Sequence, residues 1–486
     1  MVQGTSSGAG KSLLTAALCR IYARRGVRVL PFKAQNMSNN AAVTPCGGEI
    51  GRAQALQARA AGVEPRPAMN PVLLKPIADT RSEVVVLGRR DAALTALPWT
   101  ERKLALWSVV RESLAGLRAE ADLVIIEGAG SPAEINLPDI VNMRVAREAG
   151  APVLLVADID RGGAFAHLYG TWALLPAEDR ERIRGFILNK FRGNPALLAP
   201  APALLRGRTG VPTLGVVPML ALDLPDEDAA SLHDRGAPDG GIRVAAIRLP
   251  HLSNFDDLDP LAAEPGVSVR WTADPAALGN AAAIVIPGSR NTTDDLRWLW
   301  ESGLAAAIRA GAAAGTPVVG LCGGYQMLGR AVADPLGLEG GGEMKGLSLL
   351  DVHTELGETK STRQARGRWV AVSGPLAPLV GREAAGYEIH HGRTRIGAGA
   401  EPVLEIHGET AGAGAGSVWG CYLHGVFGDD ALRATWLAGL RGGVEGDGRA
   451  WEAHLESEIN RLADAVELAL DMDTVDRLAL GTAGAV

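Results

Sequence analysis

The chain opens with the stretch Gly-Thr-Ser-Ser-Gly-Ala-Gly-Lys-Ser at residues 4–12, and a strong helical pattern follows over residues 13–24. Glycines let backbone N–H groups wrap around phosphate oxygens, and the N-terminus of the following helix adds positive potential. We expect Lys11 to reach the terminal phosphates and the Ser12 hydroxyl to ligate Mg²⁺. The stretch therefore predicts a P-loop nucleotide-binding domain, whose ATP-binding residues are Thr5, Ser6, Gly8, Gly10, Lys11 and Ser12.

Apolar runs and helical stretches alternate along most of the chain, which is typical of parallel sheets covered by helices. The first set of runs occupies residues 27–32, 123–126, 153–157, 186–188 and 214–217, and a second set occupies 244–247, 283–286 and 318–321. A periodic segment over 451–480 predicts closing helices. We therefore predict an α/β chain with a first domain at 1–225, a linker at 226–241, a second domain at 242–440 and a C-terminal helical tail at 441–486.

Three polar residues follow apolar runs of the first set, where the ends of the strands are expected. Glu127 comes directly after the run 123–126, and open α/β sheets bind ligands at the carboxyl ends of their strands. A carboxylate at this point predicts a second Mg²⁺ ligand beside Ser12. Lys33 is similarly placed to hold a phosphate or a substrate carboxylate. Asn189 could read the adenine edge of ATP through its amide, or it could simply form a strand-end turn.

Composition excludes several classes of protein. The net charge is -7, which argues against nucleic-acid or membrane-surface partners because these call for a basic face. The four cysteines show no CxxC spacing, so neither a disulfide framework nor a zinc site is indicated. The chain starts without a signal-peptide pattern. We expect a cytoplasmic enzyme of two domains, with a homo-oligomer left open.

One cysteine stands in a setting that predicts a nucleophile. Cys322 follows an apolar run and is flanked by Gly320, Gly323 and Gly324, as in a strand-turn-helix elbow that exposes a nucleophile. The alternative is a buried cysteine packed as a small hydrophobe. The distant segment 421–425 contains His424 and favours a nucleophile with a general base.

The tetrahedral intermediate of such a reaction needs hydrogen-bond donors for its oxyanion. The backbone N–H of Gly323, next to Cys322, is one candidate. Gly288, in the loop 287–290 that follows the run 283–286, is the second. An ordinary turn glycine is the other interpretation of Gly288.

Several longer strings together resemble one family closely. They include Gln35-Asn36-Met37, residues 127–136, residues 157–163, and the segments around Cys322 and His424. On these strings the chain is similar, over essentially its whole length, to the glutamine-hydrolysing cobyric acid synthases. The P-loop, one residue longer than the commonest form when counted from Gly4, resembles that of dethiobiotin synthetase. The second domain resembles the class I glutamine amidotransferases.

This resemblance implies ATP-dependent amidation of the b, d, e and g carboxylates of adenosylcobyrinic acid a,c-diamide in cobalamin biosynthesis, through acyl phosphates. It implies glutamine and the corrinoid a,c-diamide as substrates, ATP and Mg²⁺ as cofactors, and no tightly bound prosthetic group. Glu49 becomes a further metal candidate by its similarity in position to a ligand of dethiobiotin synthetase. Residues in or beside the family strings are expected to attract the polyanionic corrinoid; they are Lys33, Arg52, Lys75 and Arg161.

The chain departs from the class I pattern at one position. Most class I amidotransferases have a Glu two residues beyond the catalytic His, whereas this chain has Val426 there. The group that orients His424 is therefore unknown, and glutamine hydrolysis is expected to be slow unless the ligase half is occupied. Two alternatives share the Cys/His domain: the sister enzyme that amidates the a and c carboxylates, and a related cell-wall amidotransferase. A ParA- or MinD-like nucleotide switch, which would not need Cys322, is an alternative of another class.

Overall fold

The computed structural model describes residues 1–78, 81–136, 139–227, 232, 235–236, 241–442 and 448–481, and it contains two α/β domains. The first domain is built on six parallel strands in the order β12-β11-β10-β1-β9-β2, as the alternating runs predict. Their bounds are β1 (Val2–Gly4), β2 (Val29–Lys33), β9 (Leu123–Glu127), β10 (Val153–Asp158), β11 (Ile183–Phe191) and β12 (Thr213–Pro218).

Helices cover this sheet, which is why a central strand such as β10 is buried along its whole length. They are α1 (Lys11–Arg24), α2 (Arg52–Ala60), α4 (Trp99–Glu120), α5 (Met143–Ala149), α6 (Ala164–Leu174), α7 (Ala177–Arg180) and α8 (Ala201–Thr209). Helix α1 begins directly after Gly10, whose φ of 94° is in the left-handed region that favours glycine. The chain can therefore turn sharply from β1 through the P-loop into the helix.

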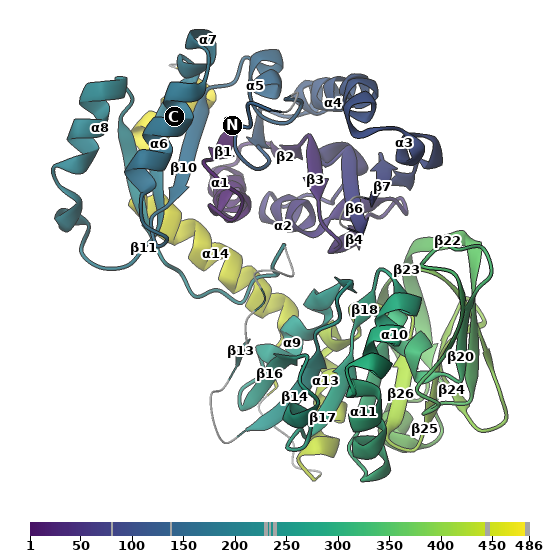
Figure 1. Ribbon diagram of the computed structural model, residues 1–486. Coiled ribbons are helices and arrows are strands. Elements are labelled where there is room, and N and C mark those ends of the chain that lie inside the picture. Colours follow the sequence, from purple (N-terminus) through teal and green to yellow (C-terminus); the bar gives the residue numbers. More distant parts are fainter. Residues whose placement is uncertain are drawn as a thin grey trace.

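Two small sheets extend the first domain towards the second (Figure 1). One pairs β3 (Gln35–Met37), β6 (Val72–Ala78), β7 (Arg81–Val86) and β8 (Arg89–Arg90), and the other pairs β4 (Ala41–Val43) with β5 (Glu49–Gly51). Helix α3 (Ala92–Ala96) follows β8. Apolar side chains from both domains join in one buried cluster, formed by Ala41, Val43, Leu73, Val85, Tyr387 and Ile389. The two domains are thus packed against each other at this point.

The second domain is built on a long mixed sheet in the order β13-β16-β14-β17-β19-β26-β25-β24-β22-β20-β21, with β23 paired to β22. Five neighbouring strands of this sheet run parallel: β16, β14, β17, β19 and β26. The next strand in the sheet, β25, pairs with β26 in the antiparallel direction. The bounds of the parallel strands are β14 (Ile242–Ile247), β16 (Val267–Thr272), β17 (Ala283–Ile286), β19 (Val318–Leu321) and β26 (Val418–Cys421). The others are β13 (Arg235–Gly236), β20 (Ala331–Asp334), β21 (Gly342–Lys345), β22 (Val352–Trp369), β23 (Glu383–Ile396), β24 (Glu401–Ile406) and β25 (Glu409–Ala415).

Helices flank this sheet as well: α9 (Asp259–Ala262), α10 (Thr292–Glu301), α11 (Leu304–Ala313), α12 (Gly323–Leu328) and α13 (Asp430–Leu440). The last two helices, α14 (Trp451–Ala469) and α15 (Met472–Leu480), return to the first domain (Figure 1). Leu455, Ile459 and Val466 of α14 share a buried cluster with α1. The predicted tail therefore completes the core of the first domain. The domain boundaries themselves remain predictions, and much of the predicted linker, together with residues 443–447 and 482–486 of the tail, lies outside the described residues.

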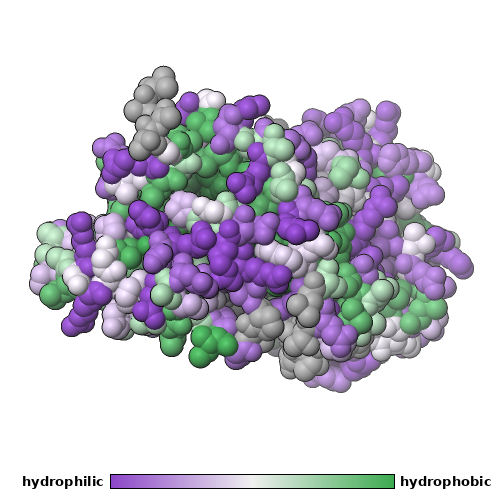
Figure 2. All heavy atoms as spheres, turned by 90° about the horizontal axis from the view of Figure 1, so that it is seen from above, coloured by the Kyte–Doolittle hydropathy of each residue, from purple (hydrophilic) through white to green (hydrophobic). Residues whose placement is uncertain are grey.

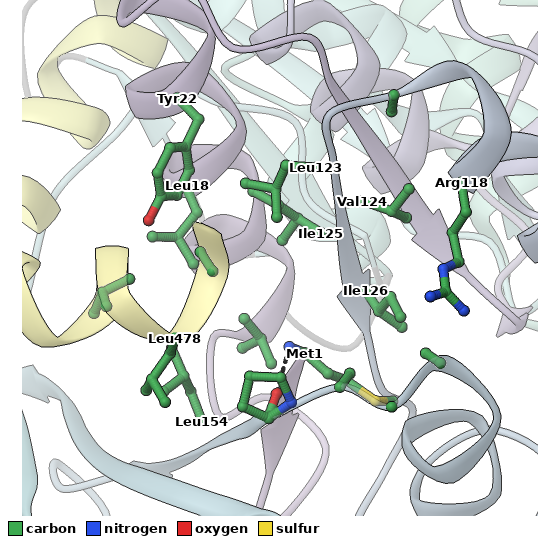
Figure 3. A pocket seen from close by; sticks show the side chains of 18 of the residues that line it. Met1, Leu18, Tyr22, Arg118, Leu123, Val124, Ile125, Ile126, Leu154 and Leu478 are labelled. Atoms are coloured by element: carbon green, nitrogen blue, oxygen red, sulfur yellow. Dashed lines mark hydrogen bonds between the residues drawn. The ribbon is translucent and has the colours of Figure 1, made fainter. Parts of the chain in front are cut away.

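A cavity opens at the amino ends of the strands of the first domain (Figure 3). Figure 2 shows apolar residues around a hollow on the face seen from above. Met1, Leu18, Tyr22 and Leu478 line this cavity, and burial lowers the pKa of the Met1 ammonium to about 5. Nucleotides bind at the opposite, carboxyl ends of open α/β sheets, so this cavity is not the candidate active site. In the described part of the chain, every helix is too short or too polar to cross a lipid bilayer.

Candidate active site

Cys322 lies at a strained turn between β19 and α12. Its φ of 50° and ψ of -107° fall where residues other than glycine are rare. The turn is also crowded, because a Cβ added at Gly323 would lie 2.8 Å from the backbone N of Ser289. The Cys322 thiol donates to the carbonyl of Ile389 at 3.5 Å. This geometry is that of a nucleophile elbow.

His424 follows β26 and is held by a carboxylate that the sequence did not reveal. Its Nδ1 donates to Oδ2 of Asp257 at 2.7 Å, and the backbone N–H of Gly425 donates to the other carboxylate oxygen at 2.7 Å. Both side chains of the pair are 1% exposed. The ring of Tyr387 stacks on His424 with centroids 5.1 Å apart. Asp257 therefore supplies the orienting group that Val426 cannot.

The environment of His424 favours its charged form. Burial of the ring lowers the pKa, but the charges of Asp257 and Cys322 and hydrogen bonds to both residues outweigh it and raise the pKa to about 10. An imidazolium at this position lies beside the sulfur that serves as the nucleophile.

The two predicted oxyanion residues lie beside this pair. Gly288 is in β18 (Gly288–Ser289), which pairs with β15 (Leu252–Ser253). A Cβ added at Gly288 would lie 3.4 Å from Cε1 of His424 and 2.8 Å from the carbonyl oxygen of Ser253. Gly323 immediately follows Cys322. The structure thus brings Gly288, Gly323, Cys322 and His424 together, while the roles of the two glycines as oxyanion donors remain predictions.

The P-loop residues are also assembled as one site. Nζ of Lys11 donates to the carbonyls of Ser6 at 2.9 Å and Gly130 at 3.1 Å. The backbone N–H of Thr5 donates to the carbonyl of Val156 at 2.8 Å and so ties the loop to β10. The Asn189 amide donates to the carbonyl of Ala9 at 2.9 Å. Asn189 therefore supports the loop, and its contact with adenine remains a prediction.

The glycines of the loop bring other side chains close to its backbone. A Cβ added at Gly10 would lie 2.0 Å from Nδ2 of Asn189, and one added at Gly8 would lie 3.6 Å from Nη2 of Arg161. The Arg161 side chain is 69% exposed and makes an ion pair of 3.5 Å with Asp158. Arg161 thus lies over the phosphate loop with most of its surface available to a ligand.

Ser12 and Glu127 form the oxygen-rich site that the sequence predicts for Mg²⁺. Oγ of Ser12 donates to Oε1 of Glu127 at 2.9 Å. The Glu127 side chain is fully buried, and its Oε2 accepts from Gln57. Hard oxygen donors of this kind suit Mg²⁺, so Ser12 and Glu127 fit the ion. Among the described residues, no group of three or more His, Cys, Asp or Glu side chains forms a metal site on its own.

A second carboxylate, Glu227, was not predicted and also reaches this point. Its Oε2 lies 2.7 Å from Oγ of Ser12, and Nζ of Lys33 lies 2.8 Å from both Glu127 and Glu227. Burial of Glu227 raises its pKa, but the charge of Lys33 together with hydrogen bonds from Lys33, Ser12 and Asn36 outweighs burial and holds the pKa below its usual value. Glu227 belongs to the polar segment after β12, which composition alone marks only as a linker.

Three other predicted site residues form ion pairs near the boundary between the domains. Glu49 pairs with Lys75 at 2.7 Å and with Lys360 of the second domain. Arg52 pairs with Asp256 at 3.0 Å. The metal role of Glu49 and the substrate roles of Arg52 and Lys75 remain predictions, because all three side chains already have partners of opposite charge.

Comparisons with known proteins cover both domains. Residues 1–227 match the CobQ/CobB/MinD/ParA nucleotide binding domain, and residues 243–432 match the CobB/CobQ-like glutamine amidotransferase domain. The cobyric acid synthase of Pelotomaculum thermopropionicum is 48% identical over 100% of this chain and 97% of its own length. That of Deinococcus radiodurans is 50% identical over 98% of this chain and 100% of its own length. This chain belongs to the cobyric acid synthase family.

Membership of the cobyric acid synthase family confirms the predicted class of enzyme, a glutamine-hydrolysing carbon–nitrogen ligase. A third relative, the cobyric acid synthase of Paracidovorax citrulli, is 52% identical over 90% of this chain and 92% of its own length. The similarity extends through the amidotransferase domain that contains Cys322. A nucleotide switch with a passive second domain does not account for this similarity.

Proposed function

We propose that the protein is a cobyric acid synthase that amidates the b, d, e and g carboxylates of adenosylcobyrinic acid a,c-diamide with nitrogen from glutamine. The observation that carries this proposal is the presence of two complete half-sites in one chain of the family. One is the Cys322–His424–Asp257 arrangement, in which Asp257 lies 2.7 Å from His424. The other is the P-loop with Ser12 and Glu127, 2.9 Å apart.

In the second domain, Cys322 attacks the side-chain amide of glutamine. His424 accepts the thiol proton through Nε2, because its Nδ1 keeps a proton that is hydrogen-bonded to Asp257. The backbone N–H groups of Gly323 and Gly288 stabilise the oxyanion. His424 then delivers its proton to the leaving ammonia, and water releases glutamate from the thioester.

In the first domain, the γ-phosphoryl group of ATP is transferred to a corrinoid carboxylate. The carboxylate needs this activation because its leaving group would otherwise be oxide. Ammonia attacks the resulting acyl phosphate, the amide forms and inorganic phosphate leaves. Lys11 balances charge on the transferred phosphoryl group. Mg²⁺, held by Ser12 and Glu127, would supply Lewis-acid stabilisation of the phosphate charge.

The corrinoid carries several carboxylates, whereas the protein has a net charge of -7, so attraction must be local. We assign this role first to Arg161, which is exposed over the P-loop. Lys33 is buried between Glu127 and Glu227 and contacts the acceptor carboxylate only after Glu227 moves. We place the reaction in the cytoplasm and leave a homo-oligomer open.

The test is incubation of the purified protein with ATP, Mg²⁺, glutamine and the a,c-diamide, followed by mass spectrometry of the corrinoid. We expect a stepwise exchange of carboxyl for amide groups at the b, d, e and g positions. A parallel incubation contains cobyrinic acid without amide groups. Amidation of this compound at its a and c carboxylates, with no change of the a,c-diamide, would identify the sister enzyme instead.

A further inference from the structure

A largely buried arginine of the first domain contacts Tyr387, the residue that stacks on the catalytic histidine of the second. Arg52 is the first residue of α2. Its Nη2 donates to the hydroxyl of Tyr387 and to the carbonyl of Ala41 at 3.0 Å, and it lies 3.0 Å from Oδ2 of Asp256. Asn254 donates to the same carbonyl of Ala41 at 2.8 Å and to the Tyr387 hydroxyl at 2.9 Å. These contacts join β4 and α2 to two elements of the second domain, strand β23 and the 3₁₀ helix Phe255–Leu258 with its N-cap Asn254.

Burial makes the Arg52 contacts energetically important. The side chains of Arg52 and Asp256 are 16% and 12% exposed, and removal of one partner from a buried ion pair leaves an uncompensated charge. Burial and the neighbouring Asp257 raise the pKa of Asp256, and Arg52 opposes both effects. Without Arg52, Asp256 must take up a proton or move towards water, and the backbone that it shares with Asp257 moves with it.

Both groups held by Arg52 lead directly to His424. Tyr387 stacks on the His424 ring with an interplanar angle of 18°, and the backbone N–H of His424 donates to the carbonyl of Tyr387 at 2.9 Å. Asp256 precedes Asp257, which accepts from Nδ1 of His424 at 2.7 Å. Arg52 therefore contacts Tyr387, which covers the face of the imidazole. It also contacts Asp256, whose neighbour in the chain, Asp257, accepts the hydrogen bond from the edge of the ring.

The same helix reaches the phosphate site of the first domain. Gln57, in the second turn of α2, donates to Oε2 of Glu127 and to the carbonyl of Ser12. Ser12 and Glu127 are the residues that fit Mg²⁺. A displacement of α2 when nucleotide binds would therefore also move Arg52, which lies in the same helix five residues before Gln57.

We propose that Arg52 is a positioning residue for glutamine hydrolysis, which aligns His424 through Tyr387 and Asp256 and links that alignment through α2 to the nucleotide site. This inference rests on the proposed function, because it takes His424 as the base that serves Cys322. It replaces the sequence-based assignment of Arg52 to corrinoid binding. It also gives a physical route by which the ligase half controls the rate of glutamine hydrolysis.

The test compares two nitrogen donors, glutamine and ammonium, in the full-length protein. Ammonium bypasses Cys322 and His424 and reports on the ligase half alone. The variants are Arg52→Gln, Arg52→Lys and Tyr387→Phe. The matched control is Arg59→Gln, which removes an arginine of the same helix that is ion-paired with Glu456 at 2.7 Å, away from His424.

We expect Arg52→Gln to lower kcat for glutamine hydrolysis by about tenfold or more, because small misplacements of catalytic groups are costly. KM for glutamine, KM for the corrinoid and the ammonium-dependent rate should stay near those of the wild type. Arg52→Lys should restore part of kcat, because it retains the charge. Tyr387→Phe should show a smaller, equally selective loss, and Arg59→Gln should show none.

Two results would overturn the inference. If the Arg52→Gln variant loses rate equally with glutamine and with ammonium and its KM for the corrinoid rises, Arg52 binds the substrate. If its kcat for glutamine hydrolysis is unchanged, Arg52 has no role in the reaction. If Arg52→Gln does not fold, Tyr387→Phe decides by the same criteria. Failure of the proposed function is distinguishable, because the wild type would then fail to amidate the corrinoid even with ammonium.

Discussion

The Asp257 carboxylate accepts a 2.7 Å hydrogen bond from the imidazole of His424, although 167 residues separate the two along the chain. Class I amidotransferases usually place the orienting carboxylate two residues after the histidine, where this chain has Val426. The same geometric role is thus filled from the 3₁₀ helix Phe255–Leu258, which directly precedes α9. What the chemistry requires is a carboxylate at Nδ1, and its position in the sequence is free to differ.

Replacement of Asp257 by Asn should impair glutamine hydrolysis strongly. The amide can present its N–H to Nδ1 and so favour the wrong tautomer of His424, and we expect kcat to fall roughly 100-fold or more. Ammonium-dependent amidation should be preserved. Steady-state glutaminase assays check this, with Asp464→Asn as a control because Asp464 is exposed and paired with Arg24 at the surface. Near-normal hydrolysis by Asp257→Asn would show that the contact is structural.

The raised pKa of His424 also predicts a pH-dependent difference in stability. The folded-state pKa of about 10 lies above the ordinary value of 6.5, so protonation of His424 stabilises the fold fully below about pH 6.5 and ceases to do so as the pH rises to about 10. The difference in unfolding free energy between wild type and Asp257→Asn should therefore shrink over this interval. Urea unfolding at both ends measures it, and a constant difference would refute the charge pairing.

Glu127→Gln should disable the ligase half alone. The substitution removes the buried charge that faces Ser12 and Lys33, and with it a ligand for Mg²⁺. Amidation should then be lost with both glutamine and ammonium, while glutaminase activity in the absence of ATP persists. Parallel assays of glutamate release and corrinoid amidation test this. Amidation at the wild-type rate would place the metal elsewhere.

Glu227→Gln should strengthen the binding of metal-free ATP. The Glu227 carboxylate lies 2.7 Å from Oγ of Ser12, close to where phosphate oxygens are expected, and its charge repels them. Removal of one nearby charge should lower Kd about three- to tenfold, in line with about 1 kcal/mol for a partly screened interaction. Calorimetry in the presence of a chelator measures this. Weaker binding by the variant would mean that Glu227 assists the nucleotide.

Regular elements could be predicted from the sequence because their signals are local. The runs 123–126, 153–157 and 283–286 all became parallel strands, and the helical pattern 13–24 became α1 within two residues. Cys322 could be found because its flanking glycines are adjacent in sequence. In each case the residues that define the feature lie within a few positions of one another.

The features that were missed depend on contacts between distant segments. Asp257 meets His424, and Glu227 meets Ser12, only when distant segments fold together, and Tyr387 meets Arg52 only when the two domains pack against each other. The acidic partners of Arg52 and Lys75 were also missed. Asp256 and Glu49 lie opposite these two side chains, whose roles in binding the corrinoid remain predictions. Periodicity and spacing contain no signal for such pairs.

The transfer of nitrogen from glutamine through Cys322 to the activated corrinoid is tested most directly by isotope labelling. Wild type and Cys322→Ala are incubated with ATP, Mg²⁺, the a,c-diamide and [amide-¹⁵N]glutamine, and the ¹⁵N content of the corrinoid is measured by mass spectrometry. We predict labelled amides with the wild type, none with Cys322→Ala, and restored amidation of that variant by unlabelled ammonium. Incorporation of ¹⁵N by Cys322→Ala at the rate of the wild type would contradict the account.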